Sequence, residues 1–278
     1  MQIDAHQHFW KYDPTQYEWI DDSMAALRRD FGPEDLALAL KENDFDGSIA
    51  VQTRQSIQET RWLLDLADRS RQILAVVGWV DLRAPNVKSQ LRELTGNPKL
   101  LGIRHIVQSE PDDQFLLRRD FLDGIAILEE FGLAYDILIY TKHLPVAIEF
   151  VKKFPRQLFV LDHLAKPPIR RGPMDSWAEG IRRLADFPNV YCKLSGLVTE
   201  ADWEHWTAEQ IRPYLDVVFD CFGPDRLMIG SDWPVCLVAA SYSRVIGLVR
   251  NYISELAPQS LPAVLGDNAA RFYRVPSR

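Results

Sequence analysis

The chain has few cysteines and fewer basic than acidic side chains. Its 278 residues contain three cysteines, at positions Cys192, Cys221 and Cys236. An odd number of widely spaced cysteines argues against a disulfide framework and a cysteine-rich metal site, and is typical of reduced thiols in the cytoplasm. The formal net charge of −7 argues against a nucleic-acid partner, because binding to phosphates needs a basic surface.

Long apolar runs are also absent. No stretch approaches the ~20 residues that span a bilayer, so we expect no contact with a membrane. The first residues, Met1–His6, have neither the basic nor the apolar region of a signal peptide. The sequence therefore predicts a cytoplasmic protein that acts on a small-molecule substrate, and it leaves the oligomeric state open.

No Gly-X-Gly-X-X-Gly motif follows the first predicted strand, which argues against a doubly wound sheet that binds dinucleotides. Instead, short apolar stretches alternate with amphipathic ones. The predicted strands cover residues 2–8, 47–53, 73–80, 100–107, 133–140, 157–162, 189–194 and 226–231. The predicted helices include residues 33–42, 56–70, 86–95, 120–131, 144–154, 175–186 and 213–222. Eight such units predict an α/β fold, a (β/α)8 TIM barrel that residues 1–278 form as one domain.

Local features refine this prediction. Ser56 precedes Glu59 at the spacing of a capping box, and Pro145 suits the first turn of its helix. Residues 9–46 are long for a first strand-to-helix connection, and they carry several aromatic side chains. We expect this segment to cover the mouth of the barrel.

The strongest candidate site joins the two ends of the chain. His6 and His8 are two positions apart on the first predicted strand, so they share one face of it. Asp232 directly follows the last predicted strand. If these strands are neighbours in a closed barrel, two imidazoles and a carboxylate meet, and such groups bind a divalent metal or activate water. Taken alone, each residue has a structural interpretation: the histidines as satisfied core residues, and Asp232 as a helix cap.

Further polar and aromatic side chains stand where the other predicted strands end. They are Gln52, Trp79, Arg104, His105, Gln108, His163, Lys193 and Trp233. Adjacent strand residues point to opposite faces, so only about half of such positions reach the barrel interior, and the choice between Arg104 and His105 stays open. A buried lysine is rare without a partner, so we expect Lys193 to be functional. We expect His143 and His205 at the surface.

On these residues the chain resembles the amidohydrolase superfamily, in its amidohydrolase 2 branch, and within that branch the hydrolases of L-fuconolactone and L-rhamnonolactone. The segments that carry the resemblance are Ile3–Trp10, Val77–Leu82, Gly102–His105, Leu161–Pro167, Cys192–Gly196 and Ile229–Pro234. The resemblance implies a (β/α)8 barrel with its site at the carboxyl ends of the strands. It also implies that the first-strand histidines and the last-strand aspartate hold a metal or the attacking water.

The resemblance bears on the metal content as well. Many members of the superfamily bind two metals through a fourth-strand Lys or Glu and a fifth-strand His, whereas strand four here offers Arg104 and His105. We therefore expect at most one divalent ion, with Zn2+ the best candidate. The ligands that the resemblance implies are His6, His8, His163 and Asp232. The lactonase branch also resembles hydrolases that work without metal, so a metal-free site stays open.

The predicted reaction is the hydrolysis of a sugar (aldono-) lactone. Asp232 takes a proton from the attacking water, and His163 protonates the leaving oxygen. A metal, Arg104, Lys193 or a protonated His163 stabilises the oxyanion. The predicted substrate-binding residues are Gln52, Trp79, Arg104, His105, Gln108, Lys193 and Trp233. The first alternative is a metal-dependent decarboxylase or amidase of the same superfamily, and the second is a non-catalytic barrel that binds sugar acids.

Overall fold

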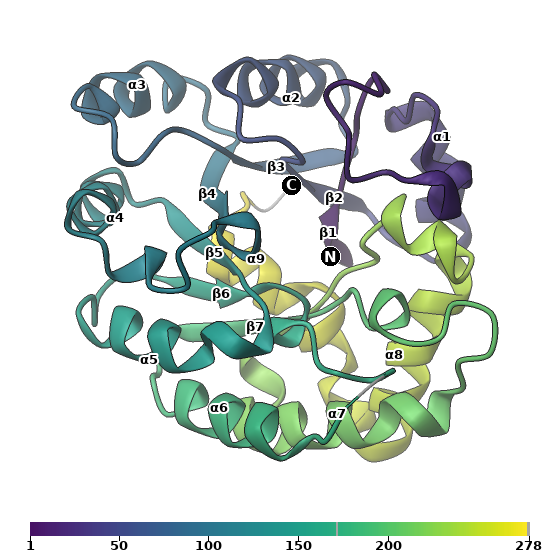
Figure 1. Cartoon of the computed structure of the whole chain (residues 1–278). Coiled ribbons are helices and arrows are strands. Elements are labelled where there is room, and N and C mark those ends of the chain that lie inside the picture. Colours follow the sequence, from purple (N-terminus) through teal and green to yellow (C-terminus); the bar gives the residue numbers. More distant parts are fainter. Residues whose placement is uncertain (171, 277–278) are drawn as a thin grey trace.

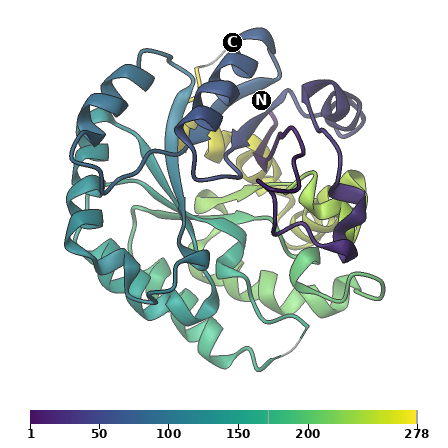
Figure 2. The same cartoon turned by 45° about the horizontal axis from the view of Figure 1, so that its top comes forward.

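The computed structural model describes residues 1–170 and 172–276, and it confirms the predicted barrel. Eight parallel strands form one sheet in the order β1 to β8, and helices surround it as an outer ring (Figures 1 and 2). The strands are β1 (Ile3–Gln7), β2 (Gly47–Val51), β3 (Ile73–Gly78), β4 (Leu100–Ile106), β5 (Ala134–Leu138), β6 (Phe159–Leu161), β7 (Val190–Leu194) and β8 (Leu227–Ile229). Each lies within the range that the sequence predicts for it.

The barrel closes where the first and last strands meet. Gln7 and Trp233 form a parallel bridge. The backbone N–H of His8 donates to the carbonyl of Trp233 at 2.7 Å, and the N–H of Asp232 donates to the carbonyl of His6 at 2.8 Å. The two ends of the chain are therefore neighbours at the carboxyl end of the barrel, as the candidate site requires.

The helices bury one face against the sheet. They are α1 (Pro33–Glu42), α2 (Ile57–Arg69), α3 (Val87–Leu94), α4 (Arg119–Phe131), α5 (Leu144–Lys152), α6 (Asp175–Ala185), α7 (Ala208–Phe222), α8 (Tyr242–Leu256) and α9 (Asn268–Tyr273). In α2, for example, Leu63 and Ala67 are fully buried while Asp65 is exposed. Full burial of a leucine contributes about 1.5–3 kcal/mol, so this periodic face fixes the helix on the barrel.

The structure departs from the prediction at the start of α7 and at the cap of α2. α7 begins at Ala208, five residues before Pro213, because Thr207 and Gln210 form a capping box there. At α2, Ser56 accepts from the N–H of Glu59, but the Glu59 carboxylate turns to the backbone N–H of Thr53 at 2.8 Å. Only half of the predicted capping box therefore forms. Pro145 lies in the first turn of α5, as predicted.

The amino end of the barrel is closed by α9. Its residues Phe272 and Tyr273 pack with Ile3 and Val160 in a buried apolar cluster. The hydroxyl of Tyr273 reaches into the barrel and lies 2.8 Å from both carboxylate oxygens of Asp136. The C-terminal helix thus supplies both the plug of the barrel and a polar contact inside it.

The long connection of residues 9–46 folds over the carboxyl end, as predicted. Trp10 anchors it, with its ring centroid 5.8 Å from that of Tyr17 and 5.3 Å from that of Phe31. Trp19 and Met24 reach the mouth of the barrel and line the cavity there. Among the described residues, every helix is too short or too polar to cross a membrane.

Candidate active site

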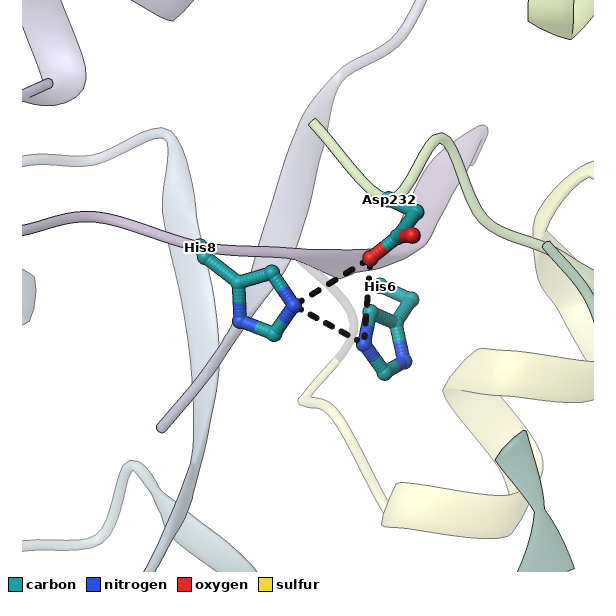
Figure 3. A group of neighbouring side chains, drawn as sticks. All are labelled: His6, His8 and Asp232. Carbon is teal, nitrogen blue, oxygen red and sulfur yellow. Dashed lines mark hydrogen bonds and ion pairs between the residues drawn. The ribbon is translucent and has the colours of Figure 1, made fainter. Parts of the chain in front are cut away.

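Three side chains from the two ends of the chain converge at the carboxyl end of the barrel (Figure 3). Nε2 of His8 lies 3.2 Å from Nε2 of His6 and 3.3 Å from Oδ1 of Asp232. Nε2 of His6 lies 3.9 Å from the same oxygen. All three side chains are buried. The structure thus brings together the three residues that the strand pairing predicts.

A buried aspartate on β1 holds the turn that presents Asp232. Asp4 accepts hydrogen bonds from the N–H of Ser231 at 2.9 Å, from its hydroxyl at 2.6 Å, and from the hydroxyl of Tyr242 at 3.1 Å. Asp232 itself has a φ of 57°, in the left-handed region that costs a non-glycine residue energy. Asp4 therefore positions the carboxylate, and sequence reasoning missed it because it reads as an ordinary strand residue.

His163 joins the cluster from the turn that follows β6. Its Nε2 lies 3.8 Å from Oδ1 of Asp232, and its Nδ1 lies 2.9 Å from the hydroxyl oxygen of Ser195. Gly196 makes room for this ring: it has a φ of 65°, and a Cβ there would lie 2.6 Å from Nδ1 of His163. Only glycine fits this position without displacing the imidazole.

The turn that carries His163 is left-handed over four consecutive residues. The φ angles of His163, Leu164, Ala165 and Lys166 are 52°, 53°, 57° and 50°. Such a conformation costs roughly 1–2 kcal/mol per residue, so the surroundings must hold it. The N–H of Lys166 donates to the carbonyl of His163 at 2.7 Å, and the indole of Trp177 donates to the carbonyl of Leu164 at 2.7 Å. The turn directs both His163 and Lys166 into the cavity.

Burial and neighbouring charges set the protonation of the cluster. Burial alone would raise the pKa of Asp232, but His163, His8 and His6 outweigh it and hold that pKa well below its usual range. Burial lowers the pKa of His163 to about 4. At neutral pH the cluster therefore combines an ionised carboxylate with a neutral His163.

The donor atoms fit a single divalent cation. Nδ1 of His8 lies 2.7 Å from the carbonyl oxygen of Val51, which can only accept, so Nε2 presents a lone pair. That lone pair faces the carboxylate of Asp232 at 3.3 Å, an arrangement that needs a shared proton or a cation. Ligand atoms of a tetrahedral zinc site lie about 3.3 Å apart, for bonds of about 2.0 Å. The ligand atoms of His6, His8 and Asp232 lie 3.2, 3.3 and 3.9 Å apart, close to that spacing. Nε2 of His163 lies 3.8 Å from Oδ1 of Asp232.

A cavity of about 390 Å³ opens over this cluster, a size typical of small-molecule sites. Its polar wall consists of His8, Thr53, Arg104, Gln108, Ser109, Tyr140, His163, Lys166, Thr199, Glu200 and Asp232. Its apolar wall consists of Trp19, Met24, Ile106, Leu138, Trp203, Val235 and Val238. Hydrogen-bonding groups beside flat apolar surfaces suit a small polar ring.

Five of the predicted site residues lie in the cavity wall. They are His8, Arg104, Gln108, His163 and Asp232. His6 lies directly beneath them, fully buried, and contacts the wall through His8. Arg104 therefore faces the barrel interior, which settles the choice that strand alternation leaves open.

Trp79, His105 and Trp233 lie outside the wall of this cavity, and their contact with substrate stays a prediction. Because Arg104 points inward, His105 points outward and stacks on Phe115 at a centroid distance of 4.6 Å. The indole of Trp79 donates to Nδ1 of His105 at 3.3 Å on that outer side. Trp233 packs under the first loop, with its ring centroid 5.2 Å from that of Phe31.

Lys193 and Gln52 also lie away from the cavity wall. Lys193 is fully buried in a lower layer, where its ammonium bonds to Asp136 and lies 3.1 Å from Oδ1 of Asp162. The prediction that it contacts substrate is not supported, because its charge is neutralised inside the barrel. Gln52 donates to the backbone carbonyl of Arg104 at 3.1 Å and so supports that residue from behind.

The two remaining histidines differ from each other. His205 is exposed, as predicted. His143 is buried, contrary to the prediction: its Nδ1 accepts from the N–H of Tyr140, and its Nε2 lies 3.2 Å from Asp113. These contacts join His143 to the turn after β5 and to the loop that carries Asp113, a pairing that sequence spacing does not show.

Sequence reasoning also missed polar side chains of the wall. Lys166 belongs to the segment Leu161–Pro167 that carries the family resemblance, yet in the sequence it reads as a loop residue. Glu200 and Trp203 lie several residues after the end of β7, where the alternation of strand residues no longer predicts which way a side chain points. The one available signal is that Lys166 and Glu200 follow strands whose carboxyl ends face the cavity, and it does not predict the direction of either side chain.

Comparison with known proteins agrees with this geometry. The sequence pattern of an amidohydrolase family matches residues 3–275. The L-fucono-1,5-lactonase of Burkholderia multivorans is 42% identical, over 99% of this chain and 97% of its own length. The L-fucono-1,5-lactonase of Burkholderia ambifaria is 38% identical, over 98% and 95%. A crystal structure of a zinc-bound amidohydrolase from Burkholderia multivorans superposes with a TM-score of 0.96 at 42% identity, covering 99% of this chain and 100% of that one. The chain belongs to the amidohydrolase family.

Proposed function

We propose that this chain is a hydrolase that opens sugar lactones, with Asp232 as the base that activates water. The observation that carries the proposal is an ionised carboxylate among three imidazoles at the base of a cavity of about 390 Å³. The relatives that are 42% and 38% identical along nearly their whole length are named L-fucono-1,5-lactonases, which supports an aldonolactone as substrate.

Asp232 serves as the base in the first step and as the acid in the second. Its carboxylate takes a proton from water as the oxygen of that water attacks the ring carbonyl. When the bond between the carbonyl carbon and the ring oxygen breaks, the same proton passes from Asp232 to the ring oxygen. The product is a hydroxy acid, and the carboxylate is restored. This sequence replaces the predicted acid role of His163, because a ring whose pKa is about 4 carries no spare proton at neutral pH.

Arg104 is the charged donor best placed for the oxyanion. Its guanidinium lines the cavity, and Nη1 lies 3.4 Å from Nε2 of His6. Lys193 is excluded from this role by its burial in the lower layer. A positioned donor of this type contributes about 3–4 kcal/mol to the transition state. A neutral His163 adds a second donor when the Ser195 hydroxyl donates to Nδ1 and leaves the proton on Nε2.

A divalent metal at the same place is part of the proposal. His6, His8 and Asp232 would hold it. His163, whose Nε2 lies 3.8 Å from Oδ1 of Asp232, would be a fourth ligand in the tautomer that leaves Nε2 unprotonated, and it would then not donate to the oxyanion. When bound, such an ion supplies Lewis-acid polarisation of a carbonyl oxygen. Metal analysis of the purified protein checks the site independently of turnover: we expect about one zinc per chain, and Asp232→Ala with His8→Ala should abolish it. A wild-type protein without bound metal after equilibration with zinc contradicts this part.

The test of the reaction is a panel of aldonolactones followed by proton release. We expect wild-type turnover without release of CO2, which separates a lactonase from a decarboxylase. Asp232→Asn should reduce kcat by about 10²–10⁴-fold while the far-UV CD spectrum stays unchanged. Asp65→Asn, an exposed aspartate on α2, is the matched control and should keep full activity. Failure of the wild type to open any lactone rejects the proposal.

A further inference from the structure

The left-handed turn after β6 places a second side chain in the cavity that the reaction does not use. Lys166 follows His163 by three positions, and both line the cavity. The ammonium of Lys166 lies 3.1 Å from a carboxylate oxygen of Glu200 and 5.6 Å from the ring centroid of Tyr140. The side chains of Lys166 and Glu200 are 20% and 24% exposed, and both line the cavity.

The turn does not need the Lys166 side chain to hold its shape. Its carbonyl groups are bound by the Trp177 indole, by the Thr141 hydroxyl at 3.2 Å and by the backbone N–H of Lys166. Leu164 and Ala165 are fully buried beneath it. The turn therefore keeps its shape through contacts that do not involve the lysine head group, and it presents that head group to the cavity without depending on it.

The charge balance of the wall points to an uncharged ligand. In the described part of the chain, Arg104 and Lys166 are the arginine and lysine of the wall, and each has a carboxylate partner. Arg104 donates to Asp162 at 3.0 Å, and Lys166 pairs with Glu200. Burial alone would lower the pKa of Lys166, but Glu200 and Tyr140 raise it, so this ammonium is charged.

We propose that Lys166 and Glu200 together recognise adjacent hydroxyl groups of the lactone and determine specificity for a polyhydroxylated ring. Each sugar hydroxyl both donates and accepts; the ammonium offers donors only, and the carboxylate offers acceptors only. Side by side at 3.1 Å, the two head groups satisfy a neighbouring pair of hydroxyls without adding net charge. Tyr140 lies beside the pair, and Trp203 lines the same cavity; both supply flat surfaces for the C–H faces of the ring. This inference rests on the proposed lactonase function.

The test compares two substrates in each variant. The substrates are an aldono-1,5-lactone and δ-valerolactone, which has the same ring without hydroxyl groups. We expect Lys166→Met and Glu200→Gln each to lower kcat/KM for the sugar lactone at least tenfold more than for δ-valerolactone, because a lost hydrogen bond to a charged group costs about ten- to a hundredfold. On an aldonolactone that lacks the recognised hydroxyls, the variants should lose no more kcat/KM relative to the wild type than they lose on δ-valerolactone.

Matched controls come from a surface pair of the same type. Lys88 and Glu130 form an exposed ion pair, and Lys88→Met and Glu130→Gln should leave the ratio of the two substrates unchanged. Thermal unfolding of Glu200→Gln checks that the fold is kept. An equal loss on both substrates overturns the inference, because it shows that the pair acts on the turn or on ring opening. If the wild type opens neither lactone, the proposed function fails first, and the two failures are thereby distinguished.

Discussion

Two layers of buried ionisable side chains lie one above the other inside the barrel, and they differ in what covers them. The upper layer contains His8, His163 and Asp232, and one side of it faces the cavity. The lower layer contains Asp136, Asp162 and Lys193, all with no exposed surface. Tyr273 of the C-terminal helix closes this lower layer from below.

The comparison shows that burial of a charge does not by itself mark a catalytic residue. In the lower layer, cations and carboxylates neutralise one another, and His6 is the link, with Nδ1 3.2 Å from the Lys193 ammonium. In the upper layer, ring nitrogens and a carboxylate oxygen point at one place that faces the cavity. We therefore expect the lower layer to govern stability and the orientation of His6, and the upper layer to govern the proposed chemistry.

Removing the cation of the lower layer should have the largest effect on stability. Lys193→Met leaves Asp136 and Asp162 buried with less compensation, and loss of one partner of a buried pair costs about 3–5 kcal/mol. Urea unfolding measures the loss. Lys88→Met, which breaks an exposed pair, should change the free energy of unfolding by less than about 0.5 kcal/mol. Equal effects of the two substitutions contradict the division into layers.

The stability deficit of Lys193→Met should depend on pH. Burial raises the pKa of Asp136 to about 6 against the influence of Lys193, so removal of Lys193 raises that pKa further. A carboxyl group whose folded pKa exceeds its unfolded value of about 3.9 stabilises the fold below that value, and loses this contribution as pH rises through the folded pKa. Urea unfolding should therefore show a smaller deficit at about pH 5 than at about pH 8. A deficit that grows towards low pH has the wrong sign for this account.

In the upper layer, Gly196→Ala should impair activity more than stability. The added Cβ would lie 2.6 Å from Nδ1 of His163 and displace the ring, and a shift of about 1 Å in a site costs about 10²-fold in rate. Gly223→Ala is the control for backbone strain alone, since Gly223 also has a positive φ, of 66°, but nothing lies within 4 Å of its Cβ position. Steady-state kinetics of both variants separate displacement of His163 from strain, and a normal kcat/KM in Gly196→Ala rejects the role of this glycine.

The smallest effect is expected where the lower layer meets α9. Tyr273→Phe removes the hydroxyl that donates to Asp136, which should cost about 1–2 kcal/mol of unfolding free energy without changing KM. Tyr252→Phe, which removes a more exposed bond to Asp216, should cost less. A change in KM for Tyr273→Phe would show that the two layers are not separate.

The fold could be predicted because strand signals are local. Each of the eight strands combines an apolar run with flanking turn residues, so alternation with helices specifies the barrel without any long-range information. The predicted start of α7 is too late, because Pro213 suits a first turn by local preference, whereas the helix begins at the cap of Thr207 and contains Pro213.

The site was predictable only in part, for a physical reason. His6, His8 and Asp232 follow from strand alternation and barrel closure, which are regular. Lys166 depends on a left-handed turn that local preferences oppose, so its direction could not be predicted from the residues. Lys193 reads like a functional lysine because a sequence shows burial but not the partners, here Asp136 and Asp162, that arrive from other strands.

Closure of the barrel by its first and last strands has a consequence for synthesis of the protein. His6 and Ser231 are joined by a hydrogen bond although 225 positions separate them. A chain still growing on the ribosome holds its histidines long before the aspartate that completes the cluster exists. Translation that stops early, or a protease cut that releases β8, should therefore yield a product without hydrolytic activity. An incomplete chain is then not active in the cell.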